Sequence, residues 1–410
     1  MGTEIKRTVS SAQLSLGALR GPVLVGGGVV GLVGLGGALG LSMGQGGDWY
    51  QSFSASYLVS FCFYISIALG GLFWVTAMHL TRAGWGICVR RLCEILAMMT
   101  LPMLVFFLPI LLPVILGSSS AVYSWVNIES ITHARDLVEH KAGYLNGGFF
   151  TVRAIAYFAV WGLLARFYLK NSVSQDLSKD PKTTLKMQSR SAPGMLLFAL
   201  TVVFASFDWE MSLDPLWFST MFPVYFFAGG VLGSLCVLTI TSVSLQKSGR
   251  LTEDITTEHY HDLGKLTFGF VFFWAYIAFS QYLLIWYANI PEETVWFLYR
   301  QQGGWEIASI VLIAGHVIVP FFAVMPRTLR RNKTYMAFAS VFILVMCWFD
   351  HFWLVMPQFR QEFGVMPADV MCLIGLGGLF VASFAWIAGD KSLIPEGDPR
   401  LYESLSYHNV

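Results

Sequence analysis

The 410-residue sequence is short of charge. Only 12% of its residues are Asp, Glu, Lys or Arg, about half the share found in an ordinary soluble domain. Hydrophobic residues make up 55% of the chain, and the mean hydropathy is +0.61. The net charge is only +1, so no basic surface suggests a nucleic-acid partner. This composition argues against an ordinary soluble enzyme and favours a protein embedded in the lipid bilayer.

Cysteine motifs and metal-binding patterns are also missing. The six cysteines lie in or beside apolar segments, and no CxxC, CxxCH or mixed Cys/His metal spacing occurs. This argues against a disulfide framework and against an iron–sulfur or zinc site. A b-type haem needs two axial histidines at one level, whereas the embedded His316 and His351 differ in depth by roughly 10 Å. We therefore expect no cofactor bound by this chain alone.

Long apolar runs, in contrast, are abundant. A helix needs about 20 apolar residues to cross the hydrocarbon core. The runs show no two-residue alternation of the kind found in barrel strands, so we predict helices. The expected fold class is all-α, a polytopic membrane protein with ten transmembrane helices. The ten predicted spans are 22–43, 55–78, 92–116, 147–170, 192–212, 215–243, 264–288, 303–325, 334–357 and 367–389.

The distribution of lysine and arginine predicts the orientation. Most of these residues fall in alternate loops, a set that includes the N-terminal segment and the C-terminal tail. Because cytoplasmic loops are enriched in Lys and Arg, we expect both termini in the cytoplasm. Arg166, near the inner end of its helix, is expected to snorkel to the inner interface. The opposite loops hold only Arg135, Lys141, Arg300 and Arg360.

An acidic pattern occurs twice, at the outer ends of two predicted helices. Asp208 lies in SFDWEMSLDPLWFST and Asp350 in CWFDHFWLVMPQF, and in both a proline follows the acid by seven residues. The helix before each of these two opens with a Gly-Gly pair. We therefore predict two four-helix bundles in the same orientation, with two peripheral helices. The predicted segments are 1–50 (cytoplasmic N-terminus and Gly-rich peripheral helix), 51–214 (first bundle), 215–360 (second bundle) and 361–410 (tenth helix and cytoplasmic tail).

Two segments lie outside this repeat or extend from it. The first predicted helix carries GxxxG spacings at Gly27/Gly31 and at Gly36/Gly40/Gly44, which let another helix approach closely. Its packing partner is either another subunit or a helix of the same chain. The loop 117–146 is the longest on the outer side, and it is either a docking surface for an external partner or a cap over the first bundle.

Polar residues within the apolar spans point to particular partners. Buried charges in membranes are costly and are usually paired. Arg153 and Asp208 lie on consecutive helices at matching depth, so we expect an ion pair. The second bundle has Ser309 in place of Arg153, if the Gly-Gly pairs are aligned. This leaves His351, Gln281 or Glu306 to partner Asp350, with Ser280 at a similar level. Glu210 and Asp214 are expected to be solvated near the outer surface.

These residues suggest a proton-exchanging site that is reached from the outside. The candidates for proton transfer are Asp350, His351, Asp208, His316 and Glu94, and the candidates for lining the bundles are Arg153, Gln281, Ser280 and Glu306. Burial in lipid favours the protonated form of a carboxyl group, and Asp350 has no arginine opposite it, so we expect Asp350 to be more easily protonated than Asp208. The alternative interpretation is structural: both acids tie helices together, His316 is hydrogen-bonded to a neighbour, and Glu94 is an interfacial carboxylate without a role.

Together, the ten helices, the two bundles with outer-face acids and the two acidic segments resemble the NrfD-like membrane subunits, in particular the smaller of the two in bacterial alternative complex III. The resemblance implies a subunit of a quinol:electron-acceptor oxidoreductase complex in the bacterial inner membrane. The relatives assemble with a larger NrfD-like sister subunit, an iron–sulfur subunit, a multihaem cytochrome c and small membrane subunits. Menaquinol is oxidised near the outer face, and electrons leave through iron–sulfur clusters.

The resemblance also assigns roles to residues of this chain. Asp208 and Asp350 with His351 become the outer ends of proton routes, and Arg153, Gln281 and His316 become bundle-lining groups. The family's larger sister holds the working quinol pocket, which would leave this chain as a proton conduit or scaffold without catalysis of its own. Two other functions stay open: a ten-helix secondary transporter, a class that commonly has interrupted helices near the midplane, and a passive membrane anchor.

Overall fold

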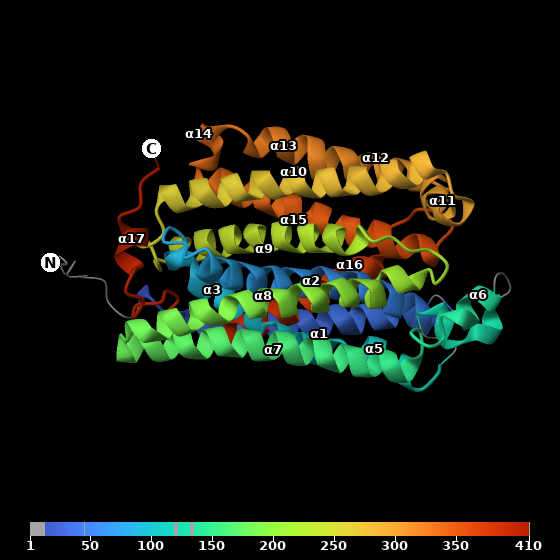
Figure 1. Cartoon of the computed structure of the whole chain (residues 1–410), viewed down its shortest axis with the longest axis horizontal. Coiled ribbons are helices and arrows are strands. Elements are labelled where there is room, and N and C mark those ends of the chain that lie inside the picture. Colours follow the sequence, from blue (N-terminus) through green and yellow to red (C-terminus); the bar gives the residue numbers. More distant parts are fainter. Residues whose placement is uncertain (1–12, 45, 119–121, 132–134, 410) are drawn as a thin grey trace.

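The structure is a computed structural model, and it describes residues 13–44, 46–118, 122–131 and 135–409 (Figure 1). The N-terminal residues 1–12 of the predicted first segment lie outside the described part. Within that part every regular element is helical, so the predicted all-α class is confirmed. Ten helical segments are long and apolar enough to cross a membrane: Gly17–Gly44, Trp49–Leu80, Ile87–Ile115, Gly147–Ser178, Pro181–Leu213, Phe222–Lys247, Thr257–Ala288, Trp305–Val324, Lys333–Gln358 and Pro367–Ala388.

Local sequence signals set the helix ends, as the turn between α7 (Gly147–Ser178) and α8 (Pro181–Trp209) shows. Lys179 ends α7 in a left-handed conformation, with a φ of 51°. Asp180 then caps α8, because its side chain accepts a hydrogen bond from the Lys182 backbone N–H at 3.0 Å. Pro181 occupies the first helical position, where its missing N–H leaves no bond unmade. The two helices therefore form a tight antiparallel pair.

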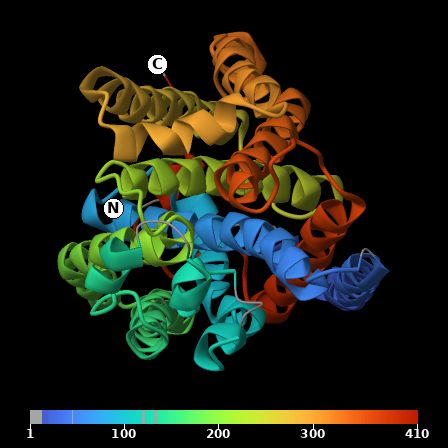
Figure 2. The same cartoon turned by 90° about the vertical axis from the view of Figure 1, so that its right-hand side faces the viewer.

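Two helices, α2 (Trp49–Leu80) and α9 (Phe222–Lys247), run through the middle of the molecule (Figures 1 and 2). Their backbones touch, because a Cβ placed on Gly70 would lie 2.5 Å from the Gly230 carbonyl oxygen. Each central helix closes a ring of neighbours on its own side. The ring of α2 contains α3 (Ile87–Met98), α7 and α8, and the ring of α9 contains α10 (Thr257–Ala288), α13 (Val319–Val324) and α15 (Lys333–Val355).

Short elements complete the two ends. The third span continues from α3 through α4 (Thr100–Phe106) and α5 (Leu108–Ile115), and the eighth span starts with α12 (Trp305–Leu312). α6 (Arg135–His140) and α11 (Pro291–Leu298) lie at one end of the bundle, on the right in Figure 1. α14 (Arg327–Arg330) and α17 (Leu401–Leu405) lie at the opposite end.

The glycine-rich α1 (Arg20–Gly44) packs against α16 (Pro367–Ala388) of the same chain. A Cβ on Gly34 would lie 2.6 Å from the Gly375 Cα, and one on Gly378 would lie 2.5 Å from the Gly31 nitrogen. The same-chain alternative is therefore the arrangement observed. The other predicted spacing faces outward: Cβ atoms on Gly36, Gly40 and Gly44 would meet nothing within 4 Å.

This difference between glycines gives a first prediction. Gly34→Leu should lower the free energy of unfolding by about 2 kcal/mol, because four extra carbons cannot fit where two backbones touch. Gly36→Leu is the matched control, since it adds the same side chain to the open face of the same helix. Thermal unfolding in detergent measures both. Equal midpoints for the two variants would contradict the α1–α16 packing described here.

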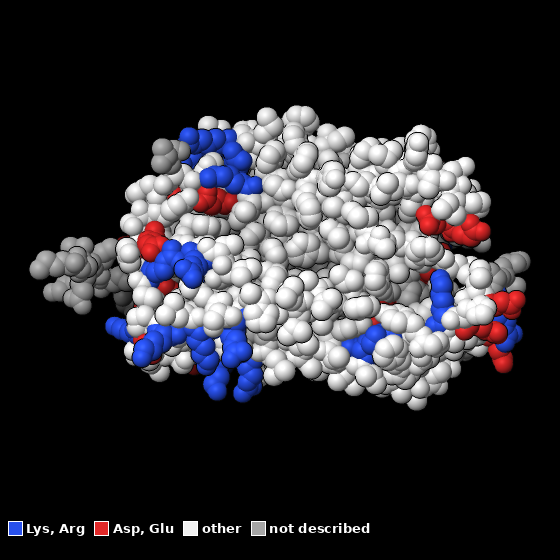
Figure 3. Space-filling view, in the orientation of Figure 1, with Lys and Arg blue, Asp and Glu red and all other residues white. Residues whose placement is uncertain are grey.

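Charged residues gather at the two ends of the molecule. On the face shown in Figure 3, the middle is almost free of charge, and most Lys and Arg lie at the end where α1 begins and α17 lies. The C-terminal tail meets the start of the described chain there, because the Leu393 N–H donates to the Leu14 carbonyl at 2.7 Å. We refer to this as the basic end and to the other as the α11 end.

Candidate functional site

The expected ion pair in the first bundle is present. Arg153 on α7 forms a two-pronged contact with Asp208 on α8, with N–O distances of 2.8 and 2.9 Å. The Tyr157 hydroxyl donates to the same carboxylate at 2.7 Å, and Arg153 also donates to the Tyr144 carbonyl at 2.9 Å. Both charged side chains are buried. Because the acid has a cation and a hydroxyl as partners, the group has the features of a structural tie between α7 and α8.

The loop 117–146, as far as its residues are described, covers this pair. The Trp125 indole donates to the Ser212 hydroxyl at 3.2 Å, and the Tyr123 hydroxyl donates to the Trp209 carbonyl at 3.2 Å. Lys141 reaches the Pro215 carbonyl at 2.6 Å, and burial lowers the pKa of this lysine. The loop therefore caps the first bundle, which agrees with one of the two predicted alternatives; its role toward an external partner stays a prediction.

Asp350 has partners that the sequence did not suggest. Its two carboxylate oxygens accept hydrogen bonds from the Tyr225 hydroxyl and from the Trp274 indole, the latter at 3.2 Å. The predicted choice among His351, Gln281 and Glu306 was wrong. Adjacent residues on a helix point about 100° apart, so Asp350 faces the interior of the second bundle while His351 faces elsewhere.

His351 instead reaches across to the first bundle. Its Nδ1 lies 2.6 Å from a carboxylate oxygen of Glu210, and its Nε2 lies 3.5 Å from the Ser66 hydroxyl. Glu210 is only 5% exposed, so the expectation that it is solvated was wrong. The chain turns at Met211–Leu213 after α8, and Glu210 stays inside the molecule beside His351. The His351–Glu210 pair therefore joins the two bundles.

His316 packs on Trp274, the residue whose indole donates to Asp350. Its ring stacks on the Trp274 indole with a centroid distance of 3.9 Å and an angle of 22°. The ring is fully buried, and neither nitrogen has a hydrogen-bond partner of normal geometry among the described residues. The surrounding turn, Ile313–Ile318, is a π-helix. Pro320 accounts for it, because it has no N–H to donate to the His316 carbonyl four residues earlier.

Three other predicted residues fall into different environments. Gln281 is buried, and its side-chain oxygen accepts from the Ser219 hydroxyl at 3.2 Å. Ser280 is only half-buried. Glu306 is exposed and folds back to accept the Gly304 N–H at 3.0 Å, so it does not line the bundle as predicted. Its place in the first turn of α12 explains this, since a carboxylate there binds the free N–H groups of the helix start.

A cavity of about 520 Å³ lies between α10, α12 and the Tyr225–Asp350 pair. It reaches the surface of the molecule, because Phe279 and Ile313 of its lining are 61% and 58% exposed. Most of the wall is apolar, and a few polar groups converge on one part of it. The residues that form the wall are Tyr225, Trp274, Ala275, Ala278, Phe279, Gln281, Tyr282, Phe297, Arg300, Gln301, Ser309, Leu312, Ile313, Val317 and Trp353.

Arg300, which the sequence places in an outer loop, is the one charged residue among the described residues that form the cavity wall. It is 1% exposed, lies flat on the Trp296 ring at 3.2 Å, and donates to three backbone carbonyls, among them those of Trp353 and Leu354. No ion pair joins it to a carboxylate of the described chain. Burial lowers the pKa of Arg300, although an arginine keeps its charge in proteins. The cavity therefore contains a fixed positive charge.

The chain matches no protein-family model and no curated protein. Its function is therefore inferred from the geometry of these sites.

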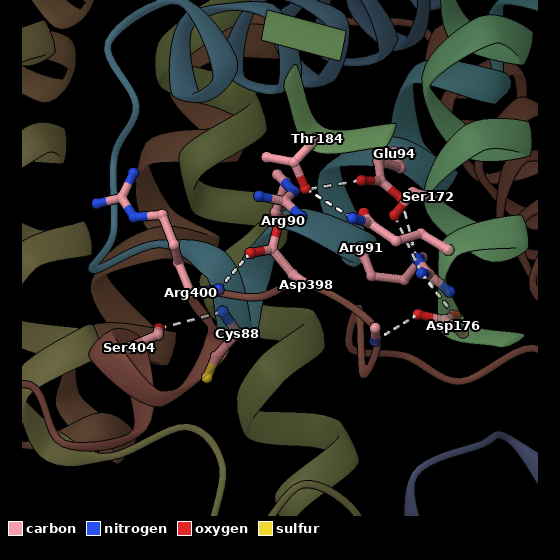
Figure 4. A network of polar contacts seen from close by, with 12 residues as sticks. Cys88, Arg90, Arg91, Glu94, Ser172, Asp176, Thr184, Asp398, Arg400 and Ser404 are labelled. Atoms are coloured by element: carbon pink, nitrogen blue, oxygen red, sulfur yellow. Dashed lines mark hydrogen bonds and ion pairs between the residues drawn. The ribbon is translucent and has the colours of Figure 1, made fainter. Parts of the chain in front are cut away.

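Glu94 lies in a separate polar cluster near the basic end (Figure 4). It is fully buried and pairs with Arg91 at 2.9 Å and with Arg90 at 3.4 Å. Arg91 also binds Asp176 at 2.8 Å, and Arg90 binds Asp398 at 2.6 Å. Three carboxylates thus share two guanidinium groups. This excess of acid is compatible with the predicted inner proton entry at Glu94, which stays a prediction.

The C-terminal tail closes the basic end beneath this cluster. Asp398 is nearly fully buried within it. Further along, the Ser404 hydroxyl accepts from the Cys88 N–H at 3.2 Å and lies 3.0 Å from the His259 Nε2. Because Cys88 belongs to α3 and His259 to α10, the tail links the two rings of helices.

Proposed function

We propose that this chain is an integral membrane subunit of a quinol-oxidising complex of the alternative complex III type, and that its second bundle accepts protons from quinol. The observation that carries the proposal is the position of the Tyr225–Asp350 pair. Tyr225 lines an apolar cavity that opens on the surface of the molecule, and its hydroxyl donates to the Asp350 carboxylate behind it. A mostly apolar pocket on which a few polar groups converge is a common form of small-molecule binding site.

The lining of the cavity suits a quinol. A quinol has a flat ring with two hydroxyl groups and a long apolar tail, so it needs a few polar contacts at one end and apolar walls elsewhere. Gln281, Arg300 and Ser309 provide the polar contacts, and Ala278, Leu312 and Ile313 belong to the apolar wall. Trp274 and Trp353 add aromatic faces on which a flat ring can stack.

In the proposed reaction, this chain accepts the protons of the quinol but not its electrons. Oxidation of one quinol to quinone releases two protons and two electrons. The electrons pass to iron–sulfur and haem centres of partner subunits. The protons leave the ring hydroxyls one at a time: Tyr225 passes its own hydroxyl proton to Asp350 and takes one from the quinol, which returns the tyrosine to its starting state. Asp350 then releases its proton before the second transfer.

The acids of the two bundles have different proposed roles. Asp208 already has Arg153 and Tyr157 as partners, so we assign it a structural role. The His351–Glu210 pair lies between the bundles and gives protons from Asp350 a neighbouring acceptor. His316, stacked on Trp274, is the next titratable ring toward the middle of the membrane. Whether it relays protons inward stays a prediction.

The orientation follows from the basic end. Cytoplasmic loops are enriched in Lys and Arg, so we place the basic end, and with it the C-terminal tail, in the cytoplasm of a bacterial cell. The α11 end, with Asp350 and the cavity, then faces the periplasm, where protons from quinol are released.

A ten-helix secondary transporter is the second candidate, and one observation favours it. The π-helical turn Ile313–Ile318 interrupts the eighth span, and interrupted helices are common in transporters. Purification in mild detergent separates the candidates. The proposed function requires that haem-containing and iron–sulfur subunits are isolated with this chain. A chain that purifies alone and transports a solute in vesicles would replace the proposal.

Filling the cavity should weaken quinol binding. Ala278→Trp should raise the KM for quinol about tenfold, which corresponds to about 1.4 kcal/mol of lost binding, because the larger ring occupies the space of the quinol. Leu283→Trp is the control, since Leu283 is on the same helix and is not part of the cavity wall. The measurement is the quinol dependence of turnover in the purified complex. An unchanged KM for Ala278→Trp would place the quinol elsewhere.

A further inference from the structure

A second surface feature lies far from the cavity, at the basic end. A groove of about 470 Å³ runs along α7 beside the junction of α3 and α4 and the turn after α16. The exposed part of its wall consists of apolar atoms, among them the aliphatic stems of its charged residues. Four of its residues, Arg166, Lys170, Val173 and Leu177, recur every three to four positions, so they form one stripe on α7. The full lining is Met98, Arg166, Leu169, Lys170, Val173, Ser174, Leu177 and Lys391.

Three cations border this groove, and no carboxylate lines it. Arg166 and Lys170 are exposed, lie one helical turn apart, and form no ion pair within the described chain. Lys391 approaches from the turn after α16, and the neighbouring acid, Asp390, pairs with Arg20 at 3.3 Å instead. Arg90, Arg91 and Arg153, in contrast, all have acidic partners. The groove therefore has an unbalanced positive charge above an apolar wall.

Lys391 itself is partly buried. Its ammonium group donates to the Ile387 carbonyl at 2.6 Å. Burial lowers the pKa of Lys391, the positive charges of Arg20 and Arg91 lower it further, and the carboxylate of Asp390 opposes them. A bound anion would offset this repulsion, because it would place a negative charge among the cations.

We infer that this groove binds an anionic phospholipid. The phosphate lies against Arg166, Lys170 and Lys391, and the first part of the acyl chains lies on Leu169 and Val173. Basic pockets between membrane helices on the cytoplasmic side commonly hold such headgroups. A free phosphate ion would use the cations but not the apolar wall. The inference is independent of quinol oxidation, since the groove is at the opposite end from the cavity.

Native mass spectrometry of the purified complex tests the inference. The complex is equilibrated with equal amounts of phosphatidylglycerol and phosphatidylcholine, and the lipid that stays bound is counted. The variant Arg166→Gln/Lys170→Gln should retain at least roughly tenfold less phosphatidylglycerol than the parent, because each cation near the headgroup contributes to binding. Lys179→Gln/Lys182→Gln is the matched control: it removes two exposed cations from the nearby turn, outside the groove.

A second variant guards against misfolding of the first. Ser174→Trp fills the groove and keeps all three cations, and it should also lose phosphatidylglycerol. Retention of phosphatidylglycerol at the parent level by either folded groove variant overturns the inference. The inference is also overturned if the parent retains the two lipids equally, or if the Lys179/Lys182 control loses as much phosphatidylglycerol as the Arg166/Lys170 variant. Displacement of the lipid by excess inorganic phosphate would show a simple anion site instead. Quinol oxidation is read separately, so failure of one proposal leaves the other testable.

Discussion

Asp350→Asn should lower the turnover of quinol oxidation about a hundredfold, which is the usual contribution of a positioned general base. Asparagine keeps the shape of the side chain and still accepts the hydrogen bond from Tyr225, but it does not take up a proton. Asp350 contacts Tyr225 and Trp274, which both line the cavity, and has no cation as a partner that would compensate for the change. The loss should appear in kcat, and the KM for quinol should change little, because the cavity wall is intact.

A suitable control is another buried acid at the same end of the molecule. Asp369 in the first turn of α16 is fully buried and binds Arg360 and the Ser56 hydroxyl, away from the cavity. Asp369→Asn should leave turnover per assembled complex within about twofold of the parent. Turnover of Asp350→Asn at the parent level, in a complex that contains all its subunits, would assign Asp350 a structural role and favour the passive-anchor alternative.

Arg153→Met should lower the free energy of unfolding by about 3–5 kcal/mol, the range measured when one partner of a buried ion pair is removed. Methionine fills much of the same volume, so the loss arises mainly from charge. The carboxylate of Asp208 would stay buried with only the Tyr157 hydroxyl as a side-chain partner. Thermal unfolding of the purified chain in detergent measures the effect.

A double-mutant cycle separates the ion pair from the packing. Asp208→Asn alone should also destabilise the chain, because it leaves the Arg153 guanidinium unpaired. The double variant should lose clearly less than the sum of the two single losses, since neither charge then lacks its partner. Arg135→Met is the control at a half-exposed pair with Glu139, where about 0.5 kcal/mol is expected. A loss as small as this for Arg153→Met would contradict the structural role assigned to the pair.

Much of the fold could be predicted from hydropathy alone. All ten predicted spans correspond to helical segments of the structure, because in lipid the backbone must satisfy its own hydrogen bonds. The Arg153–Asp208 pair could also be predicted, since two opposite charges at one depth on consecutive helices have few other partners. The depth of a residue in the membrane follows from its position along the helix, so the residue numbers were sufficient for this prediction.

The partners of Asp350 could not be predicted in the same way. Depth does not say which way a side chain points, and the 100° step between Asp350 and His351 sends them to different bundles. Helical periodicity could have shown that much. Tyr225 and Trp274 come from two other helices, and their contact depends on how α9, α10 and α15 rotate against one another. A single sequence does not contain that information.

Two acidic residues, Glu210 and Asp398, are buried because of the way their chain segments fold against the helices. Glu210 follows the last residue of α8, near the end of its span, so counting residues places it close to the surface; in the fold it is buried in a pair with His351 of α15. Asp398 lies in a polar tail that composition alone describes as solvated. The tail folds inward because Asp398 pairs with the buried guanidinium of Arg90, which also contacts Glu94.

The central claim is that quinol is bound by this chain next to Asp350, and a photoreactive quinone tests it most directly. The intact complex is illuminated with the bound probe, and the labelled peptides are identified by mass spectrometry. The account predicts labels on cavity residues of α10 and α12, such as Phe279, Tyr282 and Leu312, and loss of those labels in Ala278→Trp. Labels found only on another subunit of the complex would contradict it.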